Sequence, residues 1–282
     1  RNNNLICNFT QFYSDLKMKM AKMNARDLIV DLLLGLQGRE ISIKQIIIAA
    51  KLFDINENNI RVAVTRLSTE GVIETVGRGV YQFTQKAHEW ADVMLNRKQG
   101  IKQTKVWNLQ YLAVFTGELG RVDRTALSRR ERALKQFGFK ELEQGINIRP
   151  DNLAISFDDI CSQLRHAGLE LSAKICLINH FDSNTLSQIP SLWPTQTLNQ
   201  NYEKYNQAIQ TWLSKVAQLA LDDAAKESLM LGRQTISSLM NDPLLPESFV
   251  DVDLREQFAN SVQQLDRIGT ELWRQFYEVK FS

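Results

Sequence analysis

The feature that most constrains the fold is a series of three short amphipathic segments followed by two strand-like segments around a glycine-rich turn. Apolar residues recur in the first three at spacings of three and four, which is the periodicity of a helix with one buried face. The sequence predicts helices over residues 24–36, 42–52 and about 57–70, with Asn24 and Ser42 as caps of the first two.

The third predicted helix has two different faces. Ile60, Ala63, Val64 and Leu67 share the inward face, and Gly71 ends the helix. One face is therefore core and the other is polar. The residues expected on the outward face are Asn58, Asn59, Arg61, Val62, Thr65 and Thr69.

A hairpin is expected directly after this helix. Residues 72–76 and 80–84 can form its strands, and Gly77-Arg78-Gly79 can form the tight turn between them. Three helices followed by a hairpin is the order of the winged helix-turn-helix. The third helix of that motif enters the major groove of DNA, while the hairpin contacts the backbone or the minor groove.

The outward face carries the chemistry that such a helix needs. Arg61 can donate two parallel hydrogen bonds to the O6 and N7 atoms of guanine. Asn58 and Asn59 can reach adenine edges or phosphates, and Thr65 can bind a phosphate or touch a thymine methyl group. These four residues are the base-reading candidates.

Three further basic residues complete the DNA-binding candidates. Arg78, between two glycines that let the backbone approach the duplex, suits a phosphate or a narrow minor groove. Lys44, which opens the second helix, suits a phosphate. Arg66 either joins these contacts or, because it lies beside Leu67, is half-buried and pairs with an acidic side chain. The plainer interpretation of the whole set is an ordinary solvated surface, and winged helices also bind proteins.

The charge distribution favours a nucleic-acid partner for the first half of the chain. Residues 1–150 contain 24 Lys and Arg against 15 Asp and Glu, a balance of +9. Residues 151–282 contain 10 against 17, a balance of −7. Phosphates are attracted to the first half through counterion release and are repelled by the second.

Length and composition narrow the class of protein. The 282 residues suggest two or three domains, and 44% hydrophobic residues with only 5 Pro indicate an ordered soluble chain. Cys7, Cys161 and Cys176 lie far from any partner at metal-binding spacing, so we expect reduced thiols and no metal site. Because no long apolar run occurs and residues 1–23 lack the order of a signal peptide, we expect a cytoplasmic protein without a membrane partner.

Strand-like and helical segments alternate in the middle of the chain. The sequence predicts a strand over 106–115, a helix over 123–137, a strand region ending at 149, a helix over 155–166 and a strand over 171–177. This alternation fits a ferredoxin-like α+β unit. Its first helix carries a basic run that is either a phosphate-contacting surface or a solvated face with interspersed acids: Arg124, Arg129, Arg130, Arg132 and Lys135.

The rest of the chain is predicted to be helical. Helices are expected over 199–221, 224–240 and 254–279, and Asp242-Pro243-Leu244-Leu245-Pro246 is a stiff break between the last two. One core stripe is expected around Trp212, with Leu213, Val216, Leu219 and Ala220, and another consists of Trp273, Phe276 and Tyr277.

The expected fold class is therefore mixed α and α+β. We expect an N-terminal arm or helix over 1–23 and a winged helix-turn-helix domain over 24–98, whose last part is a further helix over 84–98. A ferredoxin-like domain over 99–190 and a C-terminal helical domain over 191–282 follow.

Several segments resemble the PaaX family of transcriptional repressors of phenylacetic acid degradation. Residues 59–84 contain an Arg, an Ala, an Arg-Leu pair, a Glu-Gly stop and a Gly-containing wing that ends in Tyr. Far downstream, Asp242-Pro243-Leu244-Leu245-Pro246-Glu247 is similar to a motif of the family's C-terminal helical region. Gly138-Phe139 and Gly145 fall where the family's Cas2-like ferredoxin fold has a Gly-Phe and a later Gly. The resemblance extends in order over about residues 24–280.

The resemblance implies a homodimeric repressor that leaves its operator when an aryl acyl-CoA thioester binds the other domains. The thioester is phenylacetyl-CoA in the best-known members, and no other cofactor is implied. Family members tend to carry paired arginines near the end of the helix before Asp242, where this chain has Ile236-Ser237 and, a turn earlier, Arg233. Arg233 is therefore the effector-binding candidate, and a different effector is the alternative.

A dimer of this kind has a geometric consequence for its target. Two copies of the third helix in successive major grooves require double-stranded operator DNA with an inverted repeat, its half-sites about 10 bp or a multiple apart.

An enzyme is the first alternative, because the middle unit resembles a nuclease fold. Its first strand ends in Phe115-Thr116-Gly117 with Glu118 as the nearby acid, whereas a metal-dependent nuclease needs acidic ligands there. His88, His166 and His180 have no catalytic spacing, and no nucleophile elbow, P-loop or dinucleotide fingerprint occurs. We expect no catalytic residue. The second alternative is a scaffold whose winged helix binds protein.

Overall fold

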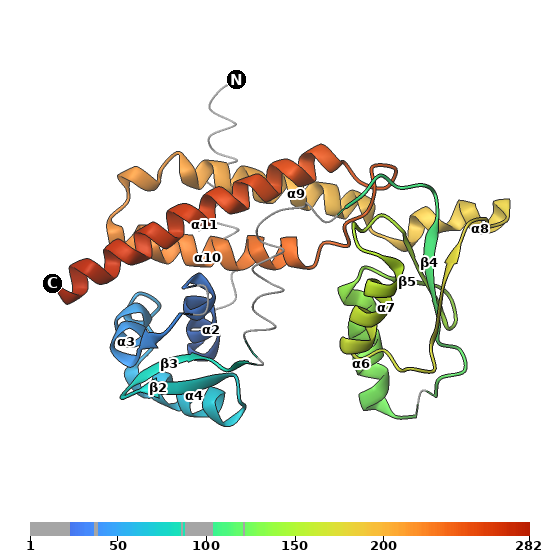
Figure 1. Ribbon diagram of the computed structural model, residues 1–282. Helices are drawn as coiled ribbons and strands as arrows, with labels where there is room; N and C mark the ends of the chain where they lie inside the picture. Colours follow the sequence, from blue (N-terminus) through green and yellow to red (C-terminus); the bar gives the residue numbers. More distant parts are fainter. Residues whose placement is uncertain (1–22, 37–38, 86, 88–103, 121) are drawn as a thin grey trace, which may run out of the picture. The chain divides into compact units, whose positions relative to one another are not determined.

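The computed structural model describes residues 23–36, 39–85, 87, 104–120 and 122–282 (Figure 1). The chain forms two compact units, and each one combines segments that are far apart in the sequence. The first unit consists of Arg1–Asn96, Asn206–Thr235 and Ser261–Ser282, and the second of Arg97–Tyr205 and Ile236–Asn260. The four predicted domains stay a prediction. The predicted arm over 1–23 and helix over 84–98 lie almost entirely outside the described residues.

The three helices predicted at the start of the first unit are confirmed. Asn24, Ser42 and Asn56 cap them, each accepting a hydrogen bond from a backbone amide of the first turn. Ser42 also forms a full capping box with Gln45. The capping residues therefore define where all three helices begin. The helices are α2 (Ala25–Gly35), α3 (Ile43–Lys51) and α4 (Glu57–Thr69).

The predicted hairpin forms, and a third short strand joins it. The strands β1 (Ile41–Ser42), β2 (Ile73–Gly77) and β3 (Val80–Phe83) pair in the antiparallel order β1-β3-β2. Gly79 in the turn has a φ of +71°, a left-handed conformation that favours glycine. Its carbonyl accepts a 2.8 Å hydrogen bond from the amide of Ile43. The tip of the hairpin is thereby joined to the start of α3.

The core of the first unit also contains residues from two C-terminal helices, α10 (Leu221–Met240) and α11 (Val252–Phe281). Ala225 of α10 and Trp273, Phe276 and Tyr277 of α11 are buried in the same cluster as the apolar faces of α2, α3 and α4. The predicted aromatic stripe of α11 is thus confirmed. The N-terminal helices do not complete this core by themselves.

The helix predicted over 199–221 is wrong at both ends. The observed helix α9 (Thr195–Leu213) begins earlier and stops where the Lys215 amide bonds to the Trp212 carbonyl, an i to i−3 bond that tightens the last turn. A 3-10 turn, η2 (Val216–Gln218), follows. Within the predicted stripe, Trp212 is buried, but the four residues after it are half-buried or exposed.

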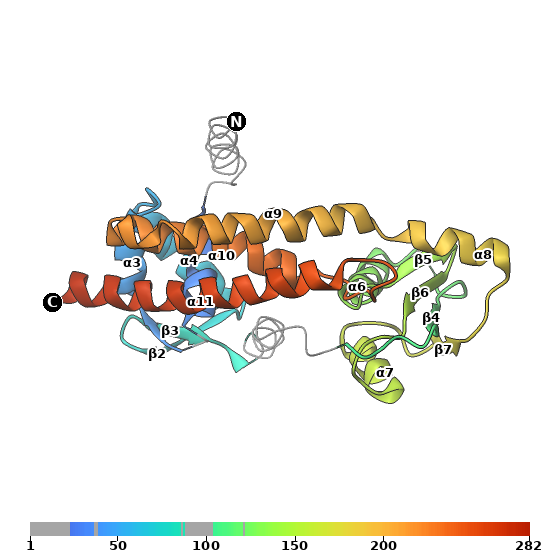
Figure 2. The same cartoon turned by 90° about the horizontal axis from the view of Figure 1, so that it is seen from above.

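The second unit contains a four-stranded antiparallel sheet, and two helices cover one of its faces (Figures 1 and 2). Leu112 and Val114 of the central strand β4 pack against both helices. The strand order is β5-β6-β4-β7. The elements in chain order are β4 (Tyr111–Phe115), α6 (Arg124–Gln136), β5 (Lys140–Glu143), β6 (Ile146–Pro150), α7 (Phe157–His166) and β7 (Lys174–Ile178).

Two predictions for this unit need correction. The strand expected from residue 106 begins only at Tyr111, because Leu109 has a φ of +67° and the Trp107 Nε1 atom donates to the Gln110 carbonyl at 2.6 Å. That local turn excludes extended pairing. After β7, a helix α8 (Ser183–Gln188) and a 3-10 turn η1 (Ile189–Leu192) occur where none were predicted.

The stiff break after α10 has a structural role in the second unit. Leu244 is buried against the sheet core, and its carbonyl accepts a 2.7 Å hydrogen bond from the buried side chain of Asn152. The next carbonyl, of Leu245, accepts a 2.6 Å bond from the buried Arg255. The Asp-Pro-Leu-Leu-Pro motif therefore anchors the chain between α10 and α11 to this unit.

Candidate nucleic-acid interface

The two faces predicted for α4 are confirmed. Ile60, Ala63, Val64 and Leu67 are buried in the core of the first unit. All of the residues predicted to face outward are exposed: Asn58, Asn59, Arg61, Val62, Thr65 and Thr69. The roles of these residues toward DNA remain predictions.

Arg61 is exposed, but it already has a partner within the helix. Its Nε atom donates to the Oε1 atom of Glu57 at 2.9 Å, and the ion pair is more than half exposed on both sides. Exposed pairs at this spacing contribute only about 0.3–0.5 kcal/mol. The guanidinium can therefore exchange Glu57 for a base or a phosphate at little cost.

The two outward threonines have their hydroxyl groups occupied. Thr65 donates from Oγ1 to the Arg61 carbonyl at 3.0 Å, and Thr69 donates to the Thr65 carbonyl at 2.9 Å. A hydroxyl has one hydrogen to donate. Thr65 can therefore donate to a phosphate, as the sequence suggested, only after it gives up its bond to the helix.

Arg66 is exposed, so the alternative of a half-buried arginine is wrong. Within the described residues its side chain forms no ion pair with an acid. The ion pair that joins α4 to α2 is formed instead by Arg26 of α2 and Glu70 at the end of α4. Arg66 thus presents a guanidinium to solvent at the edge of the outward face.

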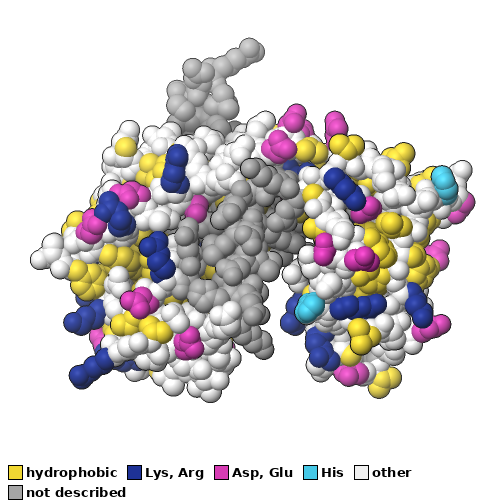
Figure 3. Space-filling model, in the orientation of Figure 1, with side chains coloured by type: hydrophobic (Ala, Val, Ile, Leu, Met, Phe, Trp, Pro, Cys, Tyr) yellow, Lys and Arg dark blue, Asp and Glu magenta, His cyan; other side chains and the backbone are white. Residues whose placement is uncertain are grey.

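The two remaining basic candidates lie at neighbouring points of the backbone. Arg78 is exposed at the tip of the hairpin, and Lys44 is exposed in the first turn of α3. The hydrogen bond from the Ile43 amide to the Gly79 carbonyl joins the residues next to them. Figure 3 shows the exposed Lys and Arg side chains of this unit among interspersed Asp and Glu side chains.

Arg233, the effector candidate, is engaged by two carboxylates. Its guanidinium donates to Asp27 at 2.6 Å and to Asp31 at 2.7 Å, and both partners belong to α2. Burial raises the pKa of Asp31 to about 6, although the pairing with Arg233 lowers it in part. Asp27 and Asp31 lie one turn apart on α2, but nothing in the local sequence indicates that Arg233, more than 200 positions later, is their partner.

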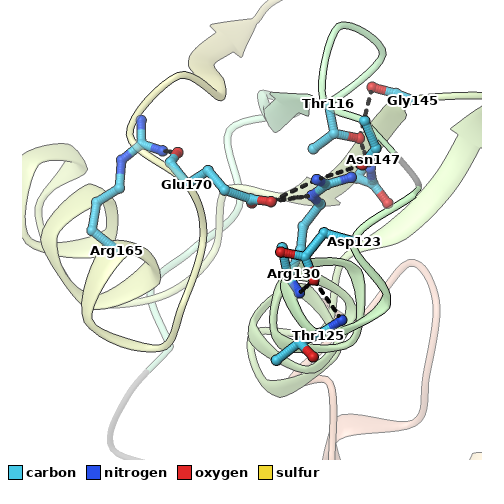
Figure 4. A network of polar contacts seen from close by, with 10 residues as sticks. Thr116, Asp123, Thr125, Arg130, Gly145, Asn147, Arg165 and Glu170 are labelled. Atoms are coloured by element: carbon cyan, nitrogen blue, oxygen red, sulfur yellow. Dashed lines mark hydrogen bonds and ion pairs between the residues drawn. The ribbon is translucent and has the colours of Figure 1, made fainter.

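The basic run of α6 is not a single surface. Arg130 is buried and pairs with Glu170 in a polar network, so both earlier interpretations are wrong for this residue (Figure 4). The hydrogen bond from Arg130 holds the pKa of Glu170 below its usual range. Arg165 closes the network from the other side by donating to the carbonyl groups of Glu170 and Ala173. The other four basic residues of the run are exposed.

A buried backbone hydrogen bond lies just after the end of β4. Thr116 is buried, and its amide donates to the Gly145 carbonyl at 2.7 Å, while Glu118 is exposed.

In the described part of the chain, no group of His, Cys, Asp and Glu side chains is arranged to hold a metal ion. Cys161 and Cys176 are free thiols, and Cys7 lies outside the described residues. None of the described helices is long and apolar enough to cross a membrane.

The N-terminal part of the first unit thus combines three helices, a three-stranded sheet and the exposed outward face of α4. Residues 24–87, which contain these elements, match the family model of the PaaX-like proteins. The resemblance seen in the sequence is confirmed for this segment: the chain carries a PaaX-like domain at its N-terminal end.

A solved structure is similar over nearly the whole chain. It is an uncharacterized protein from Mycobacterium tuberculosis, 17% identical, with a TM-score of 0.58. The match covers 92% of this chain and 99% of the other. At this identity the likeness concerns the fold alone. No curated protein matches the chain.

Proposed function

We propose that the chain is a DNA-binding transcriptional regulator, and that the PaaX-like domain is a winged helix-turn-helix. The observation that carries the proposal is the outward face of α4, where residues suited to base edges are all exposed. Arg78 at the exposed hairpin tip and the match of residues 24–87 to the PaaX-like proteins support it. In this proposal α4 enters the major groove, and Arg78 and Lys44 contact the backbone.

We assign the second unit to the ferredoxin-like, Cas2-like class and expect no catalysis there. The strand order β5-β6-β4-β7, with α6 and α7 packed on one face, supports the assignment. A metal-dependent nuclease would need a group of acidic ligands near the end of β4, where Glu118 is exposed. Among the described residues, Glu118 is not part of any group of side chains that could hold a metal ion. In this proposal the second unit serves regulation or assembly. The protein is a homodimer and lies in the cytoplasm.

The proposed regulator represses an aromatic-acid catabolic operon, of the phenylacetate type, and is released by an aryl acyl-CoA such as phenylacetyl-CoA. The PaaX-like match supports this part of the proposal. A role of Arg233 in binding the effector requires that a phosphate displace Asp27 and Asp31 from its guanidinium. Effector binding at Arg233 would then be coupled directly to α2.

The test is DNA binding as a function of salt and of two arginine substitutions. Binding of the full-length protein to its upstream DNA should weaken with salt with a log-log slope of about −0.9 per phosphate contacted. Arg61→Ala should cost about 1–3 kcal/mol on the preferred sequence and relax the sequence preference. Arg78→Ala should weaken binding to all sequences alike, because a phosphate contact carries no sequence information.

Two results would contradict the assignment. Equal losses on specific and random DNA for both variants would refute the separate roles of Arg61 and Arg78. If the protein ignores duplexes even in dilute buffer, the domain binds protein or another partner. Arg267→Ala, at an exposed position of α11 that is not among the DNA-binding candidates, is the matched control for loss of one surface arginine.

A further inference from the structure

The middle of the outward face of α4 differs chemically from its edges. Asn58, Val62, Thr65 and Thr69 are separated by four, three and four residues, so they share one stripe along the helix. By the same rotation of about 100° per residue, this stripe lies opposite the buried residues, and Arg61 and Arg66 flank it on either side. The stripe is therefore the part of α4 that is farthest from the core.

Most of this stripe presents methyl groups. The hydroxyl hydrogens of Thr65 and Thr69 are used inside the helix, by the carbonyls of residues 61 and 65. What remains of each threonine is a methyl group and an oxygen without a hydrogen to donate. Val62, between Asn58 and these threonines, is 42% exposed although valine is an apolar residue. Three successive outward positions thus offer apolar contact in a face otherwise made of amides and guanidinium groups.

We propose that this methyl stripe, formed by Val62, Thr65 and Thr69, recognises the 5-methyl groups of thymine in the major groove. The inference rests on the proposed function and adds a specific chemical target to it. The thymine methyl is the apolar group that base pairs display in the major groove, and it distinguishes T·A from the other pairs. Arg61 and Arg66 at the edges then serve guanine or phosphate, and Val62 is the residue that determines specificity for thymine.

Uracil substitution tests this directly, because uracil keeps every hydrogen-bonding group of thymine and lacks only the methyl. The full-length protein first selects its preferred duplex from a random-sequence library. Each thymine of that duplex is then replaced singly by uracil. We expect at least one position at which the wild-type protein binds about fourfold more weakly, which corresponds to the loss of one buried methyl group.

Two variants connect the uracil penalty to the stripe. Val62→Ala should bring the penalty at that position close to onefold, and Thr65→Ser, which keeps the hydroxyl and removes the methyl, should reduce a penalty at a neighbouring thymine. Val76→Ala is the matched control, because Val76 is 44% exposed in β2 of the same domain and lies outside α4. The control should keep the full uracil penalty. Thermal unfolding of each variant confirms that its fold is intact.

The outcomes separate this inference from the proposed function. If the library yields no preferred sequence, the proposed function fails. If a preferred sequence emerges but every uracil is tolerated, or if Val62→Ala keeps the full penalty, the thymine inference is overturned while the proposed function stands.

Discussion

At the scale of single residues, the contacts that depend on local periodicity were predictable and those that depend on distant partners were not. The outward residues of α4 followed from the spacing of Ile60 and its neighbours alone. Arg130 was expected at the surface, but its partner Glu170 lies 40 positions away in the sequence. Arg233 pairs with Asp31 across 202 positions, and no local pattern indicates that contact.

The burial of Asp31 predicts a pH dependence of stability. Burial raises the pKa of Asp31 from 3.8 to about 6, so the folded protein holds a proton there at pH values at which the unfolded chain has lost it. The stabilising contribution of this group is complete below about pH 4 and is lost as the pH rises through about 6. The unfolding free energy of the wild-type protein, relative to that of Asp31→Asn, should therefore fall between these pH values.

Urea unfolding at a series of pH values measures this difference, with Glu40→Gln as the control for loss of an exposed carboxyl. If the difference in unfolding free energy between the wild-type protein and Asp31→Asn stays constant from pH 4 to pH 7, the Asp31 carboxyl titrates as an ordinary surface acid.

At the scale of elements, the helices with caps were predictable to within a residue or two, whereas short or irregular segments were not. α3 begins directly after its predicted cap Ser42, and α4 begins at Glu57, where the sequence placed the start of that helix. β1 consists of two residues and exists because β3 supplies its hydrogen bonds, so the sequence carries no signal for it. The strand expected from residue 106 was lost to the left-handed conformation of Leu109.

The contribution of α11 to the first unit predicts an unequal pair of substitutions. Phe276 is fully buried in the core shared with α2, α3 and α4, whereas Phe281, just over a turn later, is 48% exposed. Phe276→Ala should cost about 3–5 kcal/mol of stability through the cavity it leaves. Phe281→Ala should change stability by less than about 0.5 kcal/mol.

Chemical unfolding under one set of conditions gives the unfolding free energies of both phenylalanine variants. Because Phe276 supports the domain that carries α4, its loss should also lower the melting temperature reported by DNA binding. Similar small effects for the two substitutions would mean that α11 is not part of the cooperative core of the PaaX-like domain.

At the scale of the whole molecule, the interleaving of the two units is the feature that the sequence least revealed. The chain changes from a basic to an acidic half near residue 150, and each compact unit takes segments from both halves. A division by charge describes the partners that each segment attracts, whereas a division by contacts depends on which apolar faces meet. The division by contacts cannot be obtained from composition.

The proposed dimer predicts the spacing of the operator. Two copies of α4 that enter successive major grooves on one side of the duplex require half-sites about 10 bp or a multiple apart, arranged as an inverted repeat. Inserting about 5 bp between the half-sites turns one of them to the opposite side of the duplex, by half a helical turn. Binding measured by footprinting should then fall to the level of a single half-site, and inserting a full turn should leave the two sites in phase. Protection of one unrepeated half-site in the intact operator would show that the protein binds DNA as a monomer, with the rest of the assignment of α4 unaffected.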